Sequence, residues 1–168
     1  MTAISTSRVE SVRPRWQAIV MVALIFWLSG SVILDLLVMP SLYVSGMMVS
    51  PDFATAGNLM FWGFNRVELI CSGLVATGLM VLSNSLSDFG KRSRTAIVLS
   101  FVLLAIALID TYALTPQMSA LGMQLNLFDS ATEAPAGMNI LHQGYFALEA
   151  LKLAVGGMLL GWCYQNQV

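Results

Sequence analysis

Four apolar stretches, each long enough to cross a lipid bilayer, constrain this chain more than any other feature of its sequence. A spanning helix needs about 20 consecutive, mainly apolar residues. Windows of this kind are expected at residues 16–39, 58–82, 95–114 and 140–163. Pro40 and Pro116 follow the first and third windows and are expected to end those helices. The sequence therefore predicts an all-α, polytopic membrane protein, built as a bundle of four transmembrane helices.

The composition also points to lipid as the solvent. Hydrophobic residues make up 57% of the chain and charged residues only 10%, against about a quarter charged in soluble domains. The formal net charge of −1 provides no basic surface for a nucleic acid. Two cysteines without a CxxC motif and a single histidine exclude a zinc ribbon, a disulfide framework and a c-type haem attachment motif.

The basic residues predict the orientation in the membrane. Lysine and arginine gather before the first window and between the second and third windows. They are Arg8, Arg13, Arg15, Lys91, Arg92 and Arg94. Residues 41–57 and 117–139 contain no lysine or arginine. Because basic loops stay in the cytoplasm, residues 1–15 and 164–168 are expected to be cytoplasmic segments on either side of one membrane domain, residues 16–163. The two loops without basic residues would then face the periplasm or an internal lumen.

The two halves of the chain share a short signature that predicts an internal repeat. Asp35 precedes Pro40 and Gly46-Met47, whereas Asp110 precedes Pro116 and Gly122-Met123. Glu68 and Glu149 lie at similar depths in the second and fourth windows. A duplicated helical hairpin would explain both features. The alternative is that proline and glycine after a helix are ordinary termination residues.

Polar and ionisable side chains within the windows gather in the half of the bundle that faces away from the termini. Asp35 and Asp110 are expected about one turn from the outer face, and His142 near the start of the fourth helix. The deeper groups, roughly 12–18 Å below that face at 1.5 Å per residue, are Arg66, Glu68, Glu149 and Lys152. Each charge at the bilayer centre costs roughly 2.5–3.5 kcal/mol on insertion scales, so these groups should face the interior and pair. The candidate polar cluster or ion site consists of Asp35, Asn65, Arg66, Glu68, Asp110, His142, Tyr145, Glu149 and Lys152.

Helical spacing indicates which members of this cluster can cooperate. A 3-4-3 spacing places His142, Tyr145, Glu149 and Lys152 in one stripe on the fourth helix. Glu149 and Lys152 can therefore pair within that helix.

On the second helix, Asn65, Glu68 and Ser72 form a comparable stripe. Arg66 lies about 200° around the helix from Glu68 at 100° per residue, so it must point elsewhere. Asp35 or Asp110 on an adjacent helix is its expected partner, because a guanidinium pairs well with a carboxylate.

The charges of the cluster do not balance. Four acids, Asp35, Glu68, Asp110 and Glu149, face two permanent cations, Arg66 and Lys152, which leaves two acids over. One interpretation is an ion-pair network that fixes the register of the helices. The other is a proton or cation site, because ionisable residues inside a membrane are functional candidates. The sequence leaves both open.

Two further patterns concern metal binding and helix packing. Met47, Met48 and Met123 lie near the outer ends of the windows together with His142, and soft thioether sulfur suits Cu(I). Methionine is also a flexible apolar filler, so packing is the alternative. Glycines in the second and fourth windows predict that these two helices cross closely, at Gly73, Gly78, Gly156, Gly157 and Gly161. Cys71 and Cys163 differ in depth, so no disulfide is expected between them.

Three runs carry a family resemblance: FWLSGSVILDLLVMPSLYVSGMM, FNRVELICSGLVATG and LHQGYFALEALKLAVGG. The chain resembles an uncharacterised family of bacterial four-helix membrane proteins, of the domain of unknown function 4149 type in the copper-resistance CopD-like group, and is most similar to cyanobacterial members. The resemblance implies a bacterial inner membrane or a thylakoid membrane, and copper handling through His142 and the outer methionines. A haem protein resembling the HemJ-type protoporphyrinogen oxidases is the other cofactor hypothesis, although the pattern of that family is not found around His142.

Taken together, these features favour a small binding or accessory membrane subunit whose interior polar cluster is structural or responds to cations or protons. Its partners would be membrane lipid and a second copy or a larger membrane complex. The alternative function is transport or handling of a cation, a proton or copper, with an outward-facing site lined by Asp35, Glu68, Asp110, His142 and Glu149. No nucleophile elbow, paired metal motif or nucleotide loop is found, so an enzyme is the least favoured class.

Overall fold

The computed structural model describes residues 3–45, 53–84, 91–128 and 137–165, and every element in these ranges is helical. In chain order the elements are α1 (Ala3–Ile33), η1 (Leu34–Val38), α2 (Met39–Val44), α3 (Phe53–Asn84), α4 (Lys91–Ile109), η3 (Asp110–Leu114), α5 (Thr115–Phe128) and α6 (Met138–Tyr164). They form four continuous helical segments that are long and apolar enough to cross a membrane: Arg15–Leu42, Thr55–Ser83, Arg92–Leu121 and Asn139–Tyr164. The predicted all-α membrane bundle is confirmed.

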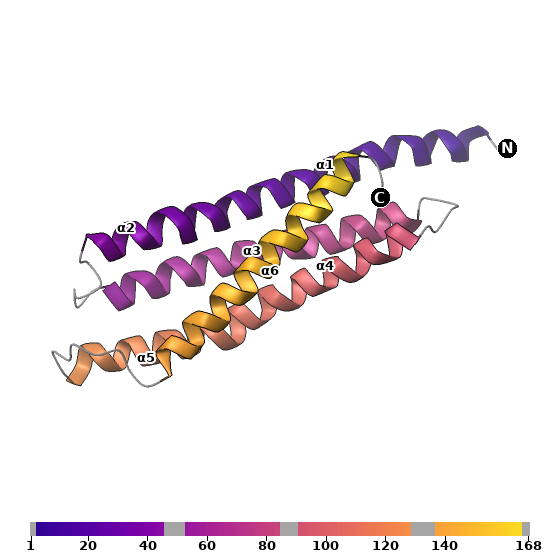
Figure 1. Cartoon of the computed structure of the whole chain (residues 1–168). Coiled ribbons are helices and arrows are strands. Elements are labelled where there is room, and N and C mark those ends of the chain that lie inside the picture. Colours follow the sequence, from indigo (N-terminus) through magenta and orange to yellow (C-terminus); the bar gives the residue numbers. More distant parts are fainter. Residues whose placement is uncertain (1–2, 46–52, 85–90, 129–136, 166–168) are drawn as a thin grey trace.

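The four segments lie side by side, with both termini at one end of the bundle (Figure 1). We call this the terminal end and the opposite one the far end. α1 packs against α3 and α6, and α4 packs against the same two helices. Within the described ranges, α3 and α6 make no close backbone contact, so they stand diagonally across the bundle. The expected close crossing of the second and fourth helices is therefore wrong.

The glycines of α3 and α6 instead admit side chains of α1. A Cβ on Gly78 would stand 2.3 Å from Cγ2 of Val20, and a Cβ on Gly156 would stand 2.7 Å from Cδ2 of Leu28. Both helices thus approach α1 closely where they lack a side chain. The sequence identified residues that permit close packing, but it assigned them to the wrong neighbour.

Two π-helical turns, η1 and η3, carry the helices past the prolines that were expected to end them. Proline lacks an N–H group, and its ring clashes with the carbonyl four residues earlier. In each π turn the hydrogen bond spans five residues, from the Met39 N–H to the Leu34 carbonyl and from the Thr115 N–H to the Asp110 carbonyl. This wider turn makes room for the ring. The predicted helix ends at Pro40 and before Pro116 are therefore wrong, because α2 and α5 continue beyond them.

The longer helices change the depth of the two aspartates. The sequence places Asp35 and Asp110 about one turn from the outer face. In the structure Asp35 is followed by helix to Val44, and Asp110 by helix to Phe128. At 1.5 Å per residue, the helix beyond Asp35 is about 14 Å long. Both aspartates therefore lie well inside the bundle, where they are buried.

The interior divides into an apolar half and a polar half. From the middle toward the terminal end, buried side chains form one apolar core: Val20, Ala23, Leu24, Trp27, Cys71, Val75, Leu79, Leu82, Ala96, Leu103, Ala107, Val155, Leu159 and Cys163. Both cysteines are free thiols, as expected. Large apolar side chains such as Val22, Phe26 and Leu36 are exposed on the outside of the bundle, which is the arrangement that a lipid solvent favours.

The contact between Gly78 and Val20 predicts the outcome of a small substitution. Gly78→Ala should lower the free energy of unfolding by about 1–3 kcal/mol, the usual cost of overpacking, because Val20 is a stiff β-branched residue. Gly73→Ala on the same helix is the matched control, since its Cβ would meet no atom within 4 Å. This control should be neutral or stabilising because alanine favours helix. Titration with a denaturing detergent measures both, and an equal loss in the two variants would contradict the packing.

Candidate functional site

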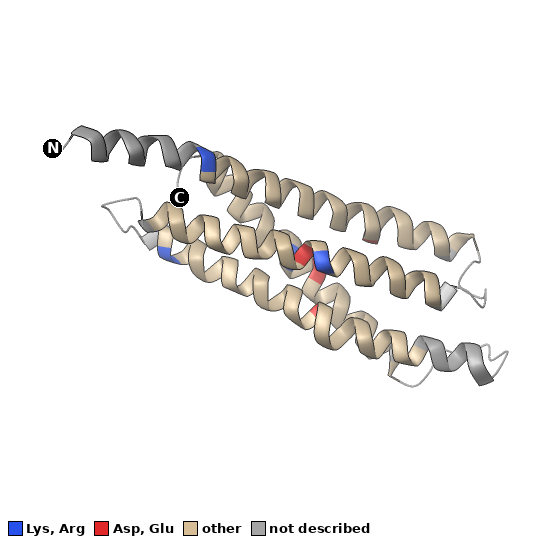
Figure 2. Cartoon of the chain, turned by 180° about the vertical axis from the view of Figure 1, so that it is seen from behind, with Lys and Arg blue, Asp and Glu red and all other residues tan. Residues whose placement is uncertain are grey.

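A cluster of buried ionisable side chains occupies the middle of the bundle and is drawn from all four helical segments. It consists of Asp35 on η1, Glu68 on α3, Asp110 on η3, and Glu149 and Lys152 on α6, all of them buried. Coloured by charge, the ribbon shows acidic segments in its middle part, between the two ends (Figure 2). We call these five residues the interior charge cluster.

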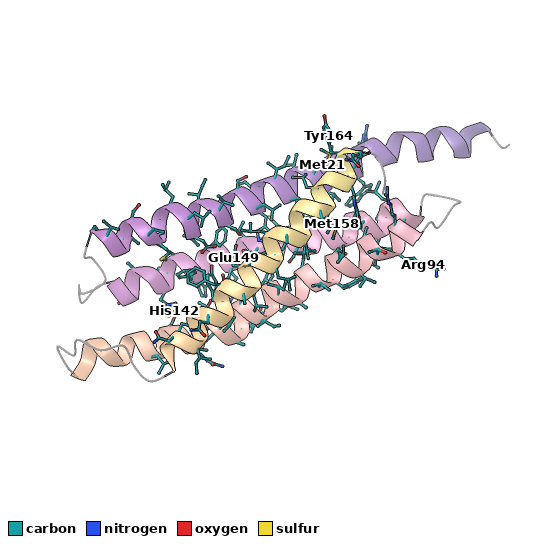
Figure 3. All side chains as sticks on the ribbon, in the orientation of Figure 1. Met21, Arg94, His142, Glu149, Met158 and Tyr164 are labelled. Carbon is teal, nitrogen blue, oxygen red and sulfur yellow. The ribbon has the colours of Figure 1, made fainter. Side chains whose placement is uncertain are left out.

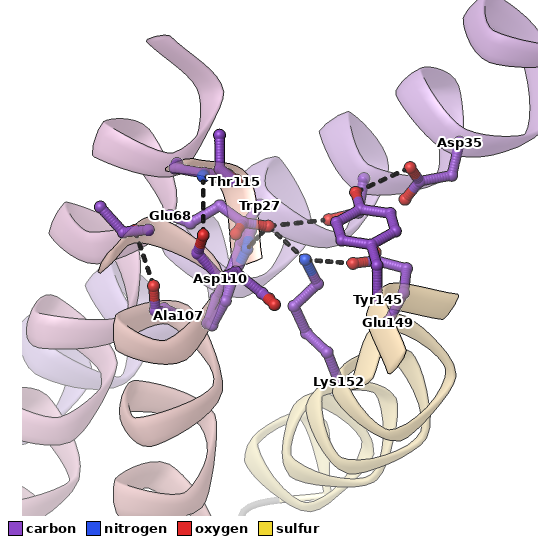
Figure 4. A network of polar contacts seen from close by, with 12 residues as sticks. Trp27, Asp35, Glu68, Ala107, Asp110, Thr115, Tyr145, Glu149 and Lys152 are labelled. Atoms are coloured by element: carbon purple, nitrogen blue, oxygen red, sulfur yellow. Dashed lines mark hydrogen bonds and ion pairs between the residues drawn. The ribbon is translucent and has the colours of Figure 1, made fainter. Parts of the chain in front are cut away.

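Lys152 is the central cation of this cluster. Its Nζ forms ion pairs with Oε1 of Glu68 on α3 and with Oε2 of Glu149 one turn earlier on α6 (Figure 4). Lys152 and Glu68 are each only 1% exposed. The predicted pairing of Glu149 with Lys152 is confirmed. The contact with Glu68 joins the two helices that stand diagonally across the bundle, which a long lysine side chain can span.

Glu68 is held by α1 as well. Trp27 donates its indole N–H to Oε1 of Glu68 at 2.8 Å, and the Ser31 hydroxyl lies 3.3 Å from the same oxygen. The Lys152 ammonium also lies 5.9 Å from the centre of the Trp27 ring. One carboxylate oxygen therefore receives donors from α1 and α6, which fixes the glutamate in the bundle centre.

Asp35 and Glu149 are two further buried acids of the cluster. Tyr145 donates its hydroxyl to Oδ1 of Asp35 at 2.9 Å, and the carboxyl groups of Asp35 and Glu149 lie close enough to repel each other electrostatically. Oδ2 of Asp35 and Oε1 of Glu149 have no hydrogen-bond donor in the described part of the chain. Two ionised carboxylates are both acceptors, so a hydrogen bond between them requires a proton.

Asp110 differs from the other acids because its carboxylate has no hydrogen-bond or ion-pair partner among the described residues. Both of its carboxylate oxygens are buried, and neither finds a hydrogen-bond donor among the described residues. The main chain at Asp110 is well anchored, since Asn65 Nδ2 donates to the Asp110 carbonyl at 3.4 Å and to Oγ1 of Thr115 at 2.7 Å. The carboxylate also lies within electrostatic reach of Lys152 and of the three other acids of the cluster.

Arg66 is not part of the interior. Its guanidinium lies over the rings of Trp62 and Tyr112, at 5.2 and 5.9 Å from their centres, and the residue is exposed on the outside of the bundle. The expected pairing of Arg66 with Asp35 or Asp110 is therefore wrong. The prediction that Arg66 and Glu68 point in different directions around the helix is confirmed, but Arg66 points to the outside of the bundle and not to a carboxylate on an adjacent helix.

The remaining predicted residues separate into two groups. Asn65, Ser72 and Tyr145 are buried beside the charged residues, as their spacing predicts. His142 is exposed, near the far end of α6, so it leaves the stripe that Tyr145, Glu149 and Lys152 share (Figure 3).

Copper and haem stay predictions. Met47 and Met48 lie outside the described residues, as does the side chain of Met123. Within the described part of the chain, no group of three or more histidine, cysteine, aspartate or glutamate residues is arranged to hold a metal ion.

The revised positions change the charge balance of the interior. The sequence count set four acids against two cations. With Arg66 outside, the buried acids Asp35, Glu68, Asp110 and Glu149 face Lys152, the one basic side chain that is buried in the described residues. If all five groups were ionised, the cluster would carry three excess negative charges. Burying unpaired charges costs several kcal/mol each, so this arrangement favours bound protons or cations.

Sequence reasoning missed Trp27, Ser31 and Thr115. Trp27 and Ser31 are spaced four residues apart, and Asp35 follows after another four, so all three can lie on one face of the first helix. That spacing could have added Trp27 and Ser31 to the predicted cluster. No sequence pattern indicates Thr115, because its contact with Asn65 depends on the π turn η3.

Comparison with protein-family models, with curated proteins and with solved structures finds no match to this chain. Functional inference therefore depends on the interior charge cluster and on the outer surface of the bundle.

The ion pair across the bundle predicts a coupled effect on stability. Lys152→Met should lower the free energy of unfolding by about 3–5 kcal/mol, since it leaves buried acids without their cation. Adding Glu68→Gln should restore part of this loss because it removes one of those acids. Detergent unfolding of both variants measures the coupling. Arg15→Met, at an exposed arginine where the first span begins, is the control and should change stability by less than about 0.5 kcal/mol. A double variant no more stable than Lys152→Met would contradict the pairing.

Proposed function

We propose that this protein is a proton-binding membrane subunit, in which the interior charge cluster takes up protons from the far end of the bundle. The observation that carries the proposal is the imbalance of four buried carboxyl groups against one buried ammonium. Proton uptake reduces the excess negative charge without a further residue. Carboxyl groups that share a low-dielectric site commonly hold a proton for this reason.

Two places in the cluster are suited to hold protons. Asp110 has two buried carboxylate oxygens without a donor among the described residues, so the neutral acid is favoured there. Asp35 and Glu149 approach each other as two acceptors, and one shared proton would turn their repulsion into a hydrogen bond. With two protons bound, two acids would remain ionised, and together with the charge of Lys152 they would give the cluster a net charge of −1.

The arrangement favours protons over a metal cation. Metal ions need several ligands that converge on one point, and no such group is present among the described residues. The carboxylates instead have separate partners, since Glu68 accepts from Trp27 and Lys152, and Asp35 accepts from Tyr145. This supports proton handling over transport of a cation that these carboxylates would bind, whereas copper binding through His142 and the outer methionines stays a prediction.

Access to the cluster is expected from the far end. Toward the terminal end, the buried side chains of the described residues are apolar or carry a hydroxyl or thiol group. No buried aspartate, glutamate, lysine or arginine of the described residues lies there. If the termini are cytoplasmic, as the basic residues predict, the protons come from the periplasm or the lumen. Transfer across the whole membrane would then need a second copy or a partner subunit, which agrees with the expected homodimer or larger complex. Membership of the CopD-like group stays a prediction.

Infrared spectroscopy can test for the bound protons. In lipid vesicles at pH 7, the protein should show the carbonyl band of a protonated carboxylic acid, which shifts in D₂O. Asp110→Asn should remove the part of the band that arises from Asp110 and leave the part from the Asp35–Glu149 pair. The same variant should reduce proton uptake after an acid pulse outside the vesicles, because it removes one protonation site.

The matched control is Ser119→Ala, whose hydroxyl donates to Oδ1 of Asn58 outside the cluster. It should leave both the carbonyl band and the proton uptake unchanged. A folded wild-type protein without a protonated carboxyl group would overturn the proposal in favour of an ion-pair network. Elemental analysis of the same preparation, made without chelator, supplies a second criterion: near-stoichiometric copper or iron would show that a metal ion, and not protons, balances the charge.

A further inference from the structure

Arg66 is the one exposed arginine in the middle part of the described spans, and no ion pair joins it to an acid of the described residues. Arg66 belongs to the span Thr55–Ser83, eleven residues from Thr55, which corresponds to about 16 Å of helix. The whole span is about 43 Å long, whereas the hydrocarbon core of a bilayer is about 30 Å thick. With the span centred, the Cα of Arg66 lies about 10 Å inside the hydrocarbon boundary.

The Arg66 side chain brings its charge closer to the hydrocarbon boundary than its Cα lies. Side chains of an α-helix lean toward its N-terminus, which for α3 is the far end of the bundle (Figure 1). The Arg66 guanidinium accordingly lies over the ring of Trp62, one turn nearer that end. Long basic side chains reach the headgroup region in this way. The guanidinium therefore stands close to the headgroups of the far leaflet.

Two aromatic side chains from different helical elements fix its position. Trp62 on α3 and Tyr112 on η3 are 58% and 62% exposed, and both rings contact the guanidinium. Each ring adds a polar hydrogen, the indole N–H and the phenol O–H. No acceptor for these hydrogens or for the guanidinium is found among the described residues, since no hydrogen bond or ion pair links the three side chains to a protein acceptor there. We call Trp62, Arg66 and Tyr112 the Arg66 site.

An unpaired arginine at this depth needs an anion, and the interior cannot supply it. The acids described within the four spans, Asp35, Glu68, Asp110 and Glu149, are all buried. For the same reason, a second copy offers no exposed carboxylate at this depth within the described residues. A lipid phosphate, in contrast, is present at every point of the headgroup layer.

We infer that the Arg66 site binds the phosphate of a phospholipid in the leaflet at the far end. A phosphodiester has two non-bridging oxygens that share one negative charge and match the fork of a guanidinium. Tryptophan and tyrosine are typical of the membrane interface, where one end of the ring is apolar and the other is hydrated. The site would hold one lipid against α3 and η3, on the outer side of the turn that carries Asp110. This inference does not depend on proton binding by the interior charge cluster.

Native mass spectrometry in a mild detergent can test this inference with phosphatidylglycerol and with diacylglycerol of the same acyl chains. The wild-type protein should retain one phosphatidylglycerol and release diacylglycerol. Arg66→Gln should weaken phosphatidylglycerol binding about tenfold or more, the loss expected for a charge-assisted hydrogen bond of about 1.5–3 kcal/mol. Arg66→Lys should lie between the two, because it keeps the charge but loses the fork.

Arg94→Gln is the matched control, because it removes an exposed arginine at the terminal end, and the retained lipid should stay bound. Equal weakening by Arg66→Gln and Arg94→Gln would show a general effect of charge and overturn the site. Retention of diacylglycerol would show that the acyl chains alone bind. If Arg66→Gln instead dissociated an oligomer while phosphatidylglycerol binding stayed unchanged, the anion would belong to a partner chain, and the lipid site would be wrong.

Discussion

The ammonium of Lys152 is the contact on which the polar half of this bundle depends. α3 and α6 do not touch through their backbones in the described ranges, yet Lys152 reaches from α6 to Glu68 on α3. Trp27 binds the same glutamate from α1. Three of the four helical segments therefore meet at one carboxylate. In lipid there is little hydrophobic force between helices, so such a polar contact can determine how they are arranged.

The sequence predicted what depends on a single helix and failed where two helices must be placed relative to each other. The apolar spans and the pairing of Glu149 with Lys152 follow from spacing along one chain segment, and both are confirmed. The partner of Arg66 and the neighbour of Gly78 depend on which face of a helix meets which neighbour. Hydrophobicity gives little help there, because side chains that face lipid are as apolar as those in the core.

The predicted helix ends at Pro40 and Pro116 were wrong because the membrane changes how a helix accommodates proline. In water, a helix can end at a proline because solvent satisfies the freed backbone groups. Inside a bilayer no water is available, so each unsatisfied group costs several kcal/mol. The chain instead widens one turn before Pro40 and before Pro116, and the helix continues. The rule that proline ends a helix therefore transfers poorly to the interior of a membrane span.

The two π turns also explain why similar aspartates have different surroundings. Asp35 is the second residue of η1, whereas Asp110 is the first residue of η3, and each turn is followed by proline after the same interval. A shift of one residue rotates a side chain by about 100° around a helix. Asp35 consequently meets Tyr145 on α6, while the Asp110 carboxylate has no donor among the described residues. This single-residue offset leaves Asp110 as the acid of the cluster whose carboxylate has neither a hydrogen-bond donor nor an ion pair among the described residues, although its main-chain carbonyl accepts hydrogen bonds from Thr115 and Asn65.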